Sequence, residues 1–355
     1  MNYSNLQEID HAVLVGVNVE ECDLDELAAL CETCDIRTVG RVVQNRKDID
    51  VTFYVGKGKV DEIKQLVEET EATCVVFDVE LSGSKVRNLE GAIGVPVLDR
   101  SKVILDIFAR RAQSMEGKMQ VELAQLKYNS TRLVASGAGL AQMKNAVGMR
   151  GPGEKKLELD KRTIREQIQT LEEKLKKVAA NRDLTRRGAA KSGKTRVCIV
   201  GYTNSGKSTL LNTIAKAGVV AEDKLFATLD PKTANIYIQK DDGTGVQVLL
   251  TDTVGFINKL PHEFIRAFES TLDEARLADL LLHVVDISNP DYQNQINVVN
   301  EVLAKIGAQD VPVIMVYNKT DMNTGFKTKE KNAVTISAKT NTGIDDLKLK
   351  IIKFV

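Results

Sequence analysis

The stretch that decides the fold runs from Val197 to Thr209 and reads VCIVGYTNSGKST. Its apolar start, typical of a buried strand, leads into the pattern G-x-x-x-x-G-K-[ST]. In that pattern backbone N–H groups converge on phosphate oxygens, and Gly201 and Gly206 keep Cβ atoms out of their way. The next helix presents its positive end, Lys207 reaches the β- and γ-phosphates, and the Ser208 hydroxyl binds Mg²⁺. The stretch predicts a nucleotide site, although alone it could also be an ordinary glycine-rich turn.

Four more short motifs follow in a fixed order. The segment Phe226–Asp230 contains a threonine at the distance at which a switch segment senses a γ-phosphate. Asp252–Gly255 is a D-x-x-G, which places a carboxylate near Mg²⁺ and a glycine N–H near the γ-phosphate. Asn318–Asp321 is an N-K-x-D, and Ser337–Lys339 can support the base. Each motif is weak alone, but all of them in the required order indicate one nucleotide site.

The N-K-x-D motif predicts which base is bound. The Asp321 carboxylate can accept two hydrogen bonds from guanine, whereas adenine would leave it unpaired, a mismatch that costs on the order of 10⁴-fold in selectivity. We expect Lys207, Thr228 and Gly255 to be catalytic, and Ser208 and Thr228 to bind Mg²⁺. The residues expected to bind GTP or GDP are Gly201, Tyr202, Thr203, Asn204, Ser205, Gly206, Lys207, Ser208, Thr209, Phe226, Ala227, Thr228, Leu229, Asp230, Asp252, Thr253, Val254, Gly255, Asn318, Lys319, Thr320, Asp321, Ser337, Ala338 and Lys339.

The composition, with 43% hydrophobic and 28% charged residues, is typical of a soluble globular protein. The 355 residues suggest two or three domains. No apolar run approaches the roughly 20 residues of a membrane span, and the N-terminus has no signal-peptide character. Five scattered cysteines favour a reducing cytoplasm. Cys31 and Cys34 form a C-x-x-C, but no second pair completes a metal site, so we interpret them as two thiols on one helix face.

Charge is unevenly distributed along the chain. Residues 1–99 hold 9 basic and 20 acidic residues, residues 100–196 hold 23 and 10, and residues 197–355 hold 17 and 19. A basic middle segment between acidic and neutral neighbours is typical of contact with nucleic-acid phosphates. A solvated, salt-bridged helix face would explain the same excess, and charge alone does not separate the two.

The first hundred residues predict a small α/β domain. His11–Val17 and Thr73–Phe77 are short β-prone runs, and Asp23–Cys34 and Lys59–Glu69 have helical spacing. The segment Gly56–Lys59, GKGK, lacks the spacing and the terminal Ser or Thr of a phosphate loop. We interpret it as a turn before a helix.

Residues 101–194 predict an antiparallel helical hairpin followed by a linker. The pattern is helical over Ser101–Leu133, and a heptad seam runs along a second helix, Glu154–Val178. Between them, Val134–Gly153 has five glycines and no periodicity, which predicts a long loop of the kind that is often functional. The polar, basic stretch Asn181–Lys194 predicts the boundary to a third domain, residues 195–355.

These motifs together resemble the HflX family within the TRAFAC-type GTPases. Besides the nucleotide motifs, the resemblance is carried by DTVGFI at 252–257 running on to LPH at 260–262, YVGKGK at 54–59, the run at 98–112, EGKMQVELAQL at 116–126 and RGPGE at 150–154. It covers nearly the whole chain. The fold class it implies is α/β: a P-loop GTPase domain with a mixed, mostly parallel sheet flanked by helices (195–355), preceded by a small α/β HflX domain (1–100) and an antiparallel helical hairpin (101–194).

The resemblance also implies a function. Such a protein hydrolyses GTP with Mg²⁺ and binds the rRNA and proteins of the large ribosomal subunit, often splitting or rescuing stalled or stressed ribosomes. Lys144 and Arg150, in the loop between the two helices, would contact rRNA. We expect a cytoplasmic monomer without a membrane span. Two alternatives stay open: a ribosome-assembly GTPase, and an rRNA-binding module that uses GTP mainly as a structural ligand.

Three features bear on these expectations. The approach to Arg150, KNAVGM at 144–149, is less glycine-rich than is usual in the family, and the chain ends soon after a predicted helix, Asp345–Ile352, so we expect no extra C-terminal domain. Many GTPases place a water-orienting Gln directly after D-x-x-G, where this chain has Phe256. We therefore expect slow intrinsic hydrolysis, on the order of 10⁻³ s⁻¹ or less, that the ribosome accelerates.

Overall fold

The computed structural model describes residues 11–141, 152–190, 194–215, 225–239, 244–259, 264, 269–323 and 325–354. The chain divides into two compact units: Met1–Arg110 with Val121–Lys174, and Arg111–Gln120 with Leu175–Val355. Two long helices, α5 (Met115–Ala141) and α6 (Pro152–Ala190), contribute one part to each unit.

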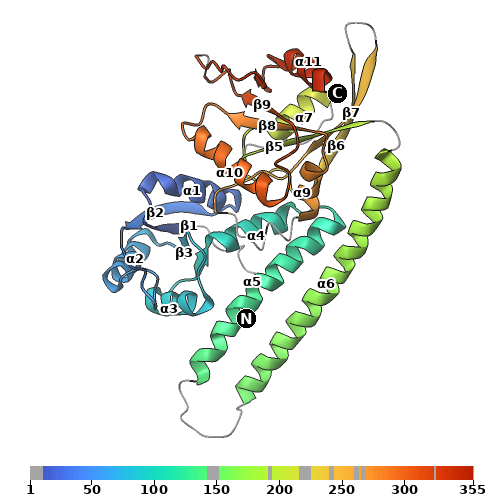
Figure 1. Ribbon diagram of the computed structural model, residues 1–355. Coiled ribbons are helices and arrows are strands. Elements are labelled where there is room, and N and C mark those ends of the chain that lie inside the picture. The colour runs from blue at the N-terminus through green and yellow to red at the C-terminus, as the bar shows by residue number, and fades with distance from the viewer. Residues whose placement is uncertain are drawn as a thin grey trace. The chain divides into compact units, whose positions relative to one another are not determined.

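A four-stranded parallel sheet of order β2-β1-β3-β4 lies at the centre of the first unit (Figure 1). Strands β1 and β3, in the middle of the sheet, are almost entirely apolar and buried, as expected where helices cover both faces, whereas the edge strand β2 is more polar. Val13 and Val15 pack in one core with Ile63 of α2 and Leu89 of α3. The elements are β1 (His11–Val17), η2 (Glu21–Leu24), α1 (Asp25–Thr33), β2 (Arg37–Gln44), α2 (Lys57–Thr70), β3 (Cys74–Phe77), α3 (Gly83–Ile93), β4 (Val97–Asp99) and α4 (Arg100–Arg111). The small α/β domain is confirmed.

The helical pattern expected over Ser101–Leu133 is two helices, not one. Helix α4 ends at Arg111 and α5 begins at Met115. The break occurs at Ser114, whose hydroxyl accepts a hydrogen bond from the Gly117 N–H at 2.8 Å and so caps the new helix. An interruption of three residues does not change the 3.6-residue apolar spacing enough to be visible in the sequence.

Helix α5 continues to Ala141, so the loop expected from Val134 begins later than predicted. Each glycine in this stretch costs a helix only about 1 kcal/mol relative to Ala, and Ala and Leu favour it, so the two glycines before Ala141 do not end it. The rest of the expected loop, including Lys144 and Arg150, lies outside the described residues.

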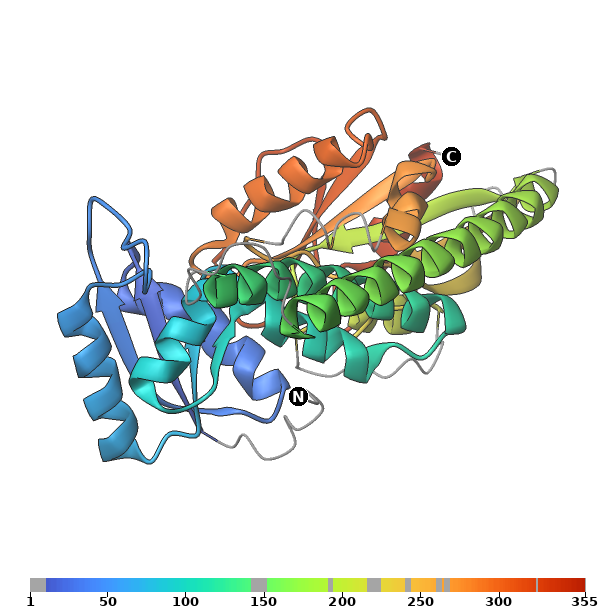
Figure 2. The same cartoon turned by 90° about the horizontal axis from the view of Figure 1, so that it is seen from below.

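Helix α6 is longer at both ends than the predicted Glu154–Val178. It begins with Pro152, a residue favoured at the first helical position, and it continues through the first part of the expected linker to Ala190. The two helices run side by side in opposite directions (Figures 1 and 2), and an ion pair of 2.7 Å joins Lys127 to Glu172. Of the predicted seam, Leu171 is buried, and Ile164, Ile168, Leu175 and Val178 are half-buried.

A buried polar cluster fixes α5 to the end of β4 within the first unit. Asp99, which is fully buried, accepts hydrogen bonds from the Tyr128 hydroxyl at 2.9 Å and from the Leu81 N–H at 3.0 Å, and it pairs with Arg132. Burial raises the pKa of Tyr128 well above its usual value, and the neighbouring Asp99 charge adds to this. With the Lys102 N–H, which donates to Asp99 Oδ1 at 2.9 Å, the buried carboxylate has four donors and is satisfied, so the cluster is a structural anchor.

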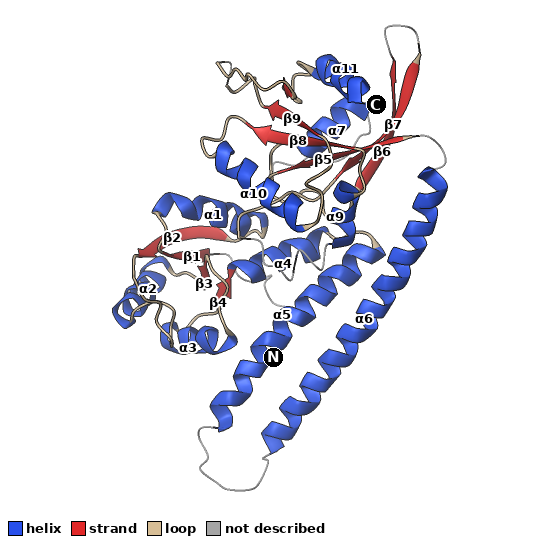
Figure 3. Cartoon of the chain, in the orientation of Figure 1, coloured by secondary structure: helices blue, strands red, loops and turns tan. Residues whose placement is uncertain are grey.

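The second unit is built on a six-stranded sheet of order β10-β9-β8-β5-β7-β6 (Figure 3). Only β6 is antiparallel, paired with β7. Leu210 of α7 and Leu347 of α11 pack on one face of this sheet, against Val197 and Val316. The elements are β5 (Thr195–Gly201), α7 (Lys207–Ala215), β6 (Lys232–Gln239), β7 (Gly245–Asp252), α9 (Glu269–Arg276), β8 (Leu280–Asp286), α10 (Tyr292–Lys305), β9 (Val313–Asn318), β10 (Ala333–Thr335) and α11 (Ile344–Phe354). The predicted mixed, mostly parallel sheet is confirmed. None of the helices in the described ranges is long and apolar enough to cross a membrane.

Candidate active site

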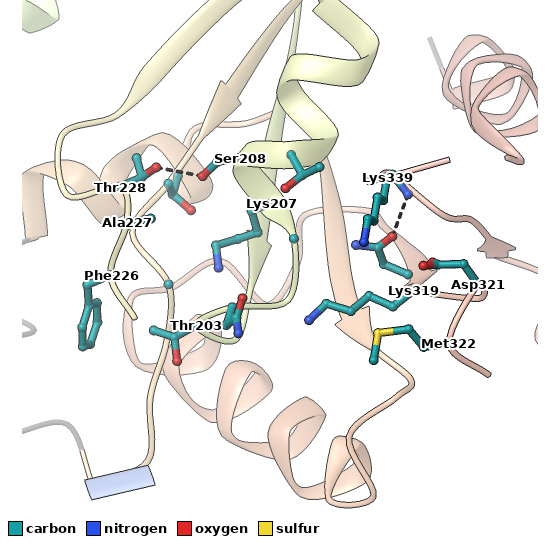
Figure 4. A pocket seen from close by; sticks show the side chains of 17 residues that line it. Thr203, Lys207, Ser208, Phe226, Ala227, Thr228, Lys319, Asp321, Met322 and Lys339 are labelled. Atoms are coloured by element: carbon teal, nitrogen blue, oxygen red, sulfur yellow. Dashed lines mark hydrogen bonds between the residues drawn. The ribbon is translucent and has the colours of Figure 1, made fainter. Parts of the chain in front are cut away.

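A cavity of about 410 Å³ opens where β5, β7 and β9 end. The carboxyl ends of parallel strands share one edge of the sheet, so the loops that follow them meet there (Figure 4). Its lining residues are Thr203, Asn204, Gly206, Lys207, Ser208, Thr209, Phe226, Ala227, Thr228, Thr253, Gly255, Asn318, Lys319, Asp321, Met322, Ala338 and Lys339. The structure thus brings together all five sequence motifs.

Sixteen of these 17 residues belong to the set expected from the sequence, and Met322 does not. Met322 directly follows the N-K-x-D motif, and an exposed methionine in a loop carries no sequence signal. Nine expected residues stand behind or beside the cavity and do not line it: Gly201, Tyr202, Ser205, Leu229, Asp230, Asp252, Val254, Thr320 and Ser337. A sequence motif marks all of its residues as site residues, but only some residues of a loop can face a cavity.

Three side-chain oxygens converge at one end of the cavity. The Ser208 and Thr228 hydroxyls are 2.8 Å apart, and they lie 2.7 and 3.0 Å from Asp252 Oδ2. Asp252 Oδ1 is buried and has no hydrogen-bond partner in the structure. Burial raises the pKa of Asp252, and the Lys207 charge opposes this. Hard oxygen donors with one unsatisfied carboxylate oxygen fit a Mg²⁺ ion. Within the described ranges, no cluster of three or more His, Cys, Asp or Glu offers another metal site.

Lys207 is the buried one of the three lysines that line the cavity. It begins α7, is buried, and its Nζ donates to the Tyr202 carbonyl at 2.6 Å. Burial lowers the pKa of Lys207 to about 8, against the raising effect of Asp252. A Cβ on Gly255 would lie 2.9 Å from Lys207 Nζ, so glycine is needed there for close approach. The three residues expected to be catalytic, Lys207, Thr228 and Gly255, therefore line the same cavity.

Phe256, the residue after D-x-x-G, is hydrogen-bonded through its backbone to the phosphate loop. Phe256 N–H donates to the Gly201 carbonyl at 3.1 Å, and the Thr203 N–H donates to the Phe256 carbonyl at 2.7 Å. The Asn258 N–H donates to the Tyr202 hydroxyl at 2.8 Å. The Phe256 side chain is only 1% exposed, so it packs in the interior and no polar group at this position faces the cavity.

The opposite end of the cavity is built by the N-K-x-D loop. Asn318 Nδ2 donates to the Ser205 carbonyl at 2.9 Å, and Asn318 Oδ1 accepts from the Ala338 N–H at 3.0 Å. Asp321 Oδ1 accepts from the Ser337 hydroxyl at 2.7 Å, which leaves its second oxygen to face a base. Asn318 thus connects three loops, and Asp321, the residue expected to recognise guanine, lines this end of the cavity.

The chain matches three protein-family models in succession. Residues 21–109 match the N-terminal domain of GTP-binding GTPases, residues 111–188 match their middle region, and residues 196–319 match the 50S ribosome-binding GTPases. The "GTPase HflX" of Lacrimispora saccharolytica is 49% identical over 352 residues, which cover 96% of this chain and 82% of that protein. The chain belongs to the HflX family of GTPases.

Two other comparisons agree with this assignment. The HflX GTPases of Caldanaerobacter subterraneus subsp. tengcongensis and Escherichia coli K12 are 46% and 42% identical, over 95% and 92% of this chain and 79% and 77% of theirs. The crystal structure of SsGBP in complex with GDP superposes with a TM-score of 0.52 at 25% identity, covering 97% of this chain and 98% of that one. As an HflX GTPase, the protein binds GTP and hydrolyses it.

Proposed function

We propose that this HflX GTPase acts on the large ribosomal subunit, where it splits or rescues stalled or stressed ribosomes. The observation that carries the proposal is the long hairpin attached to the GTPase unit. Its helices hold 27 and 39 residues, or about 40 and about 60 Å at 1.5 Å per residue. Helices of that length exceed what packing in a small domain requires, and they suit a partner much larger than the protein. The family of 50S ribosome-binding GTPases that residues 196–319 match supports the choice of partner.

Contact with rRNA is assigned to the hairpin. Residues 100–196 hold 23 basic against 10 acidic residues, and Arg162 and Arg165 lie on the exposed surface of α6. Lys144 and Arg150, in the segment between the two helices, are proposed as further phosphate contacts. Binding that neutralises phosphates releases counterions, so affinity for the large subunit should fall steeply with salt. The same function would place the protein in the cytoplasm, as a monomer.

The nucleotide site would work as a switch. GTP would lie against Lys207, and Mg²⁺, held by Ser208, Thr228 and Asp252, would neutralise charge on the β- and γ-phosphates. Thr228 belongs to the segment that senses the γ-phosphate, so it would join the metal only in the GTP state. Because Phe256 offers no polar group, the isolated protein should hydrolyse GTP slowly and the ribosome should complete the site.

Sedimentation with purified large subunits tests the partner, and light scattering of 70S ribosomes tests splitting. We expect a GTP analogue to support binding better than GDP, and the double variant Arg162→Glu, Arg165→Glu to bind at least about tenfold more weakly, as loss of several phosphate contacts requires. Lys327→Glu with Lys329→Glu, two exposed lysines in a loop of the GTPase unit, is the matched control and should bind normally.

Other outcomes would redirect the assignment. Binding confined to immature large subunits, with no loss of light scattering from 70S ribosomes, would indicate an assembly GTPase. Ribosome binding without any acceleration of hydrolysis would indicate a module that uses GTP as a structural ligand. If a variant that lacks residues 142–151 still splits ribosomes at the wild-type rate, the role proposed for Lys144 and Arg150 is overturned.

A further inference from the structure

Asp230, although it ends the switch motif Phe226–Asp230, does not line the nucleotide cavity. Its carboxylate lies at the start of α5, 116 residues earlier in the chain. Oδ2 accepts hydrogen bonds from the backbone N–H of Gln113 at 2.9 Å and from that of Ser114 at 2.9 Å. The Ser114 hydroxyl donates to Oδ1. All of these residues belong to the GTPase unit.

The start of α5 favours a carboxylate at this place. The first N–H groups of a helix have no partners within the helix, and its N-terminus carries partial positive charge, so an anion is stabilised there. A Cβ on Gly117 would come within 2.4 Å of Asp230 Oδ1 and 3.1 Å of the Ser114 hydroxyl. Glycine at position 117 therefore leaves room for the Asp230 carboxylate, which a Cβ there would have to displace.

The residue two positions before Asp230 is Thr228. Its hydroxyl lies 2.8 Å from that of Ser208 and donates to Asp252 Oδ2 at 3.0 Å, and it is 4% exposed. Leu229, between the two, is 2% exposed. Two residues of extended chain span at most about 7 Å, so a fixed Asp230 confines Thr228 to a small volume. Holding a reacting group in place in advance removes an entropic cost from binding and from the transition state.

We propose that Asp230 is a positioning residue for GTP hydrolysis. It acts through Thr228: anchored to the first turn of α5, it holds the switch segment so that the Thr228 hydroxyl meets Ser208 and Asp252. The proposal rests on the assignment of Thr228 to the Mg²⁺ and γ-phosphate end of the site.

Two variants disturb the anchor from opposite sides. Asp230→Asn keeps the shape of the side chain but replaces an acceptor with a donor facing N–H groups. Gly117→Ala does not change the Asp230 side chain itself, but its methyl group fills the space that the carboxylate occupies. Because Ala favours a helix more than Gly does, this variant cannot act by weakening α5. Asp345→Asn, which removes an exposed carboxylate that pairs with Lys348 on α11, is the matched control.

Three measurements separate positioning from a purely structural role. In single-turnover assays both variants should hydrolyse GTP about tenfold more slowly, the scale typical of lost supporting contacts around a metal site. A non-hydrolysable GTP analogue should bind more weakly by a similar factor, while GDP binding stays unchanged. In the nucleotide-free protein, hydrogen exchange should become faster across residues 226–230 and at the amides of Gln113 and Ser114. Asp345→Asn should match the wild type in all three.

The double variant Thr228→Ala, Asp230→Asn decides the route of action. If Asp230 acts through Thr228, the double variant hydrolyses GTP no more slowly than Thr228→Ala alone. If the double variant loses the sum of the two single losses in hydrolysis rate, the proposal is overturned. It is also overturned if Asp230→Asn lowers thermal stability but keeps the wild-type preference for the GTP analogue over GDP. Should Thr228→Ala itself keep that preference, the assignment of Thr228 fails, which is a distinct result from failure at Asp230.

Discussion

Asn318 Nδ2 donates a hydrogen bond of 2.9 Å to the carbonyl oxygen of Ser205, a residue of the phosphate loop. The N-K-x-D motif is usually thought of as the part of the site that recognises the base, but here its asparagine also supports the loop that binds phosphate. A Cβ on Gly206, which has a φ of +94°, would lie 2.2 Å from Asn318 Nδ2. The phosphate and base ends of the cavity are therefore one connected structure.

We expect Gly206→Ala to weaken GDP and GTP equally. The new methyl group would displace Asn318 and strain the backbone, and loss of a buried hydrogen bond costs about 1–3 kcal/mol, or roughly ten- to hundredfold in affinity. Titration with a fluorescent GDP analogue measures this. Gly91→Ala, on α3 where a Cβ meets nothing within 4 Å, is the control. A selective loss of GTP alone would contradict the bracing role.

Asp321→Asn should change the preferred base from guanine to xanthine. The amide brings a donor where the carboxylate accepted, so GTP should bind about 10- to 100-fold more weakly and xanthosine triphosphate more strongly. Competition between the two nucleotides for the variant checks the reversal. The assignment would be wrong if ATP and GTP bound the wild type equally.

Thr228→Ala should separate GTP from GDP. We propose that Thr228 joins the metal only in the GTP state, so GDP affinity should stay near the wild-type value while Mg²⁺-dependent binding of a GTP analogue falls. Ser208→Ala, at the other hydroxyl, should weaken both nucleotides when Mg²⁺ is present. Calorimetry with and without Mg²⁺ distinguishes them; equal loss of GDP and GTP in Thr228→Ala would count against the switch.

Phe256→Gln should not restore fast hydrolysis. The Phe256 side chain is buried, and backbone hydrogen bonds to Gly201 and Thr203 hold this segment in place. The amide of a glutamine at this position would therefore be buried too. An unpaired buried amide should lower the free energy of unfolding by about 1–3 kcal/mol. Single-turnover assays and urea denaturation measure the two effects, with Phe256→Leu as the apolar control. A large gain in rate for Phe256→Gln would show that the segment can turn this side chain outward.

Stability should fall in mild acid because of His283. This residue of β8 is 1% exposed and its Nδ1 has no hydrogen-bond partner; burial, aided by the Lys207 charge, lowers its pKa to about 4. The unfolded chain takes up this proton near pH 6.5, so the free energy of unfolding is highest above that pH and decreases as pH falls towards 4. The loss from this one group should be up to about 3 kcal/mol. In urea denaturation from pH 7 to 4, the free energy of unfolding should decline less steeply in His283→Gln than in the wild type. If the decline is the same in both, other groups cause it.

Much of the candidate site could be predicted from the sequence, because each of its motifs lies in one loop. A phosphate loop needs two glycines, a lysine and a hydroxyl at fixed spacing, and those requirements are local. Where the helix predictions were wrong, the local signal was weak: three residues between α4 and α5 hardly change the apolar spacing, and two glycines did not end α5. No local pattern could predict a contact between distant segments, such as that of Ser114 with Asp230, 116 residues away.

The sequence by itself determined the α/β class, the order of the nucleotide motifs, the preference for guanine and the presence of a helical hairpin. Apolar periodicity and short motifs encode these features within a few residues of one another. Only the tertiary structure decided that Asp230 binds the start of α5, that Asn318 braces the phosphate loop and that the Phe256 side chain is buried. The physical reason is that a hydrogen bond or a packed ring depends on where two segments meet in space. For Asn318 and Ser205, 113 positions apart, no local pattern records that meeting.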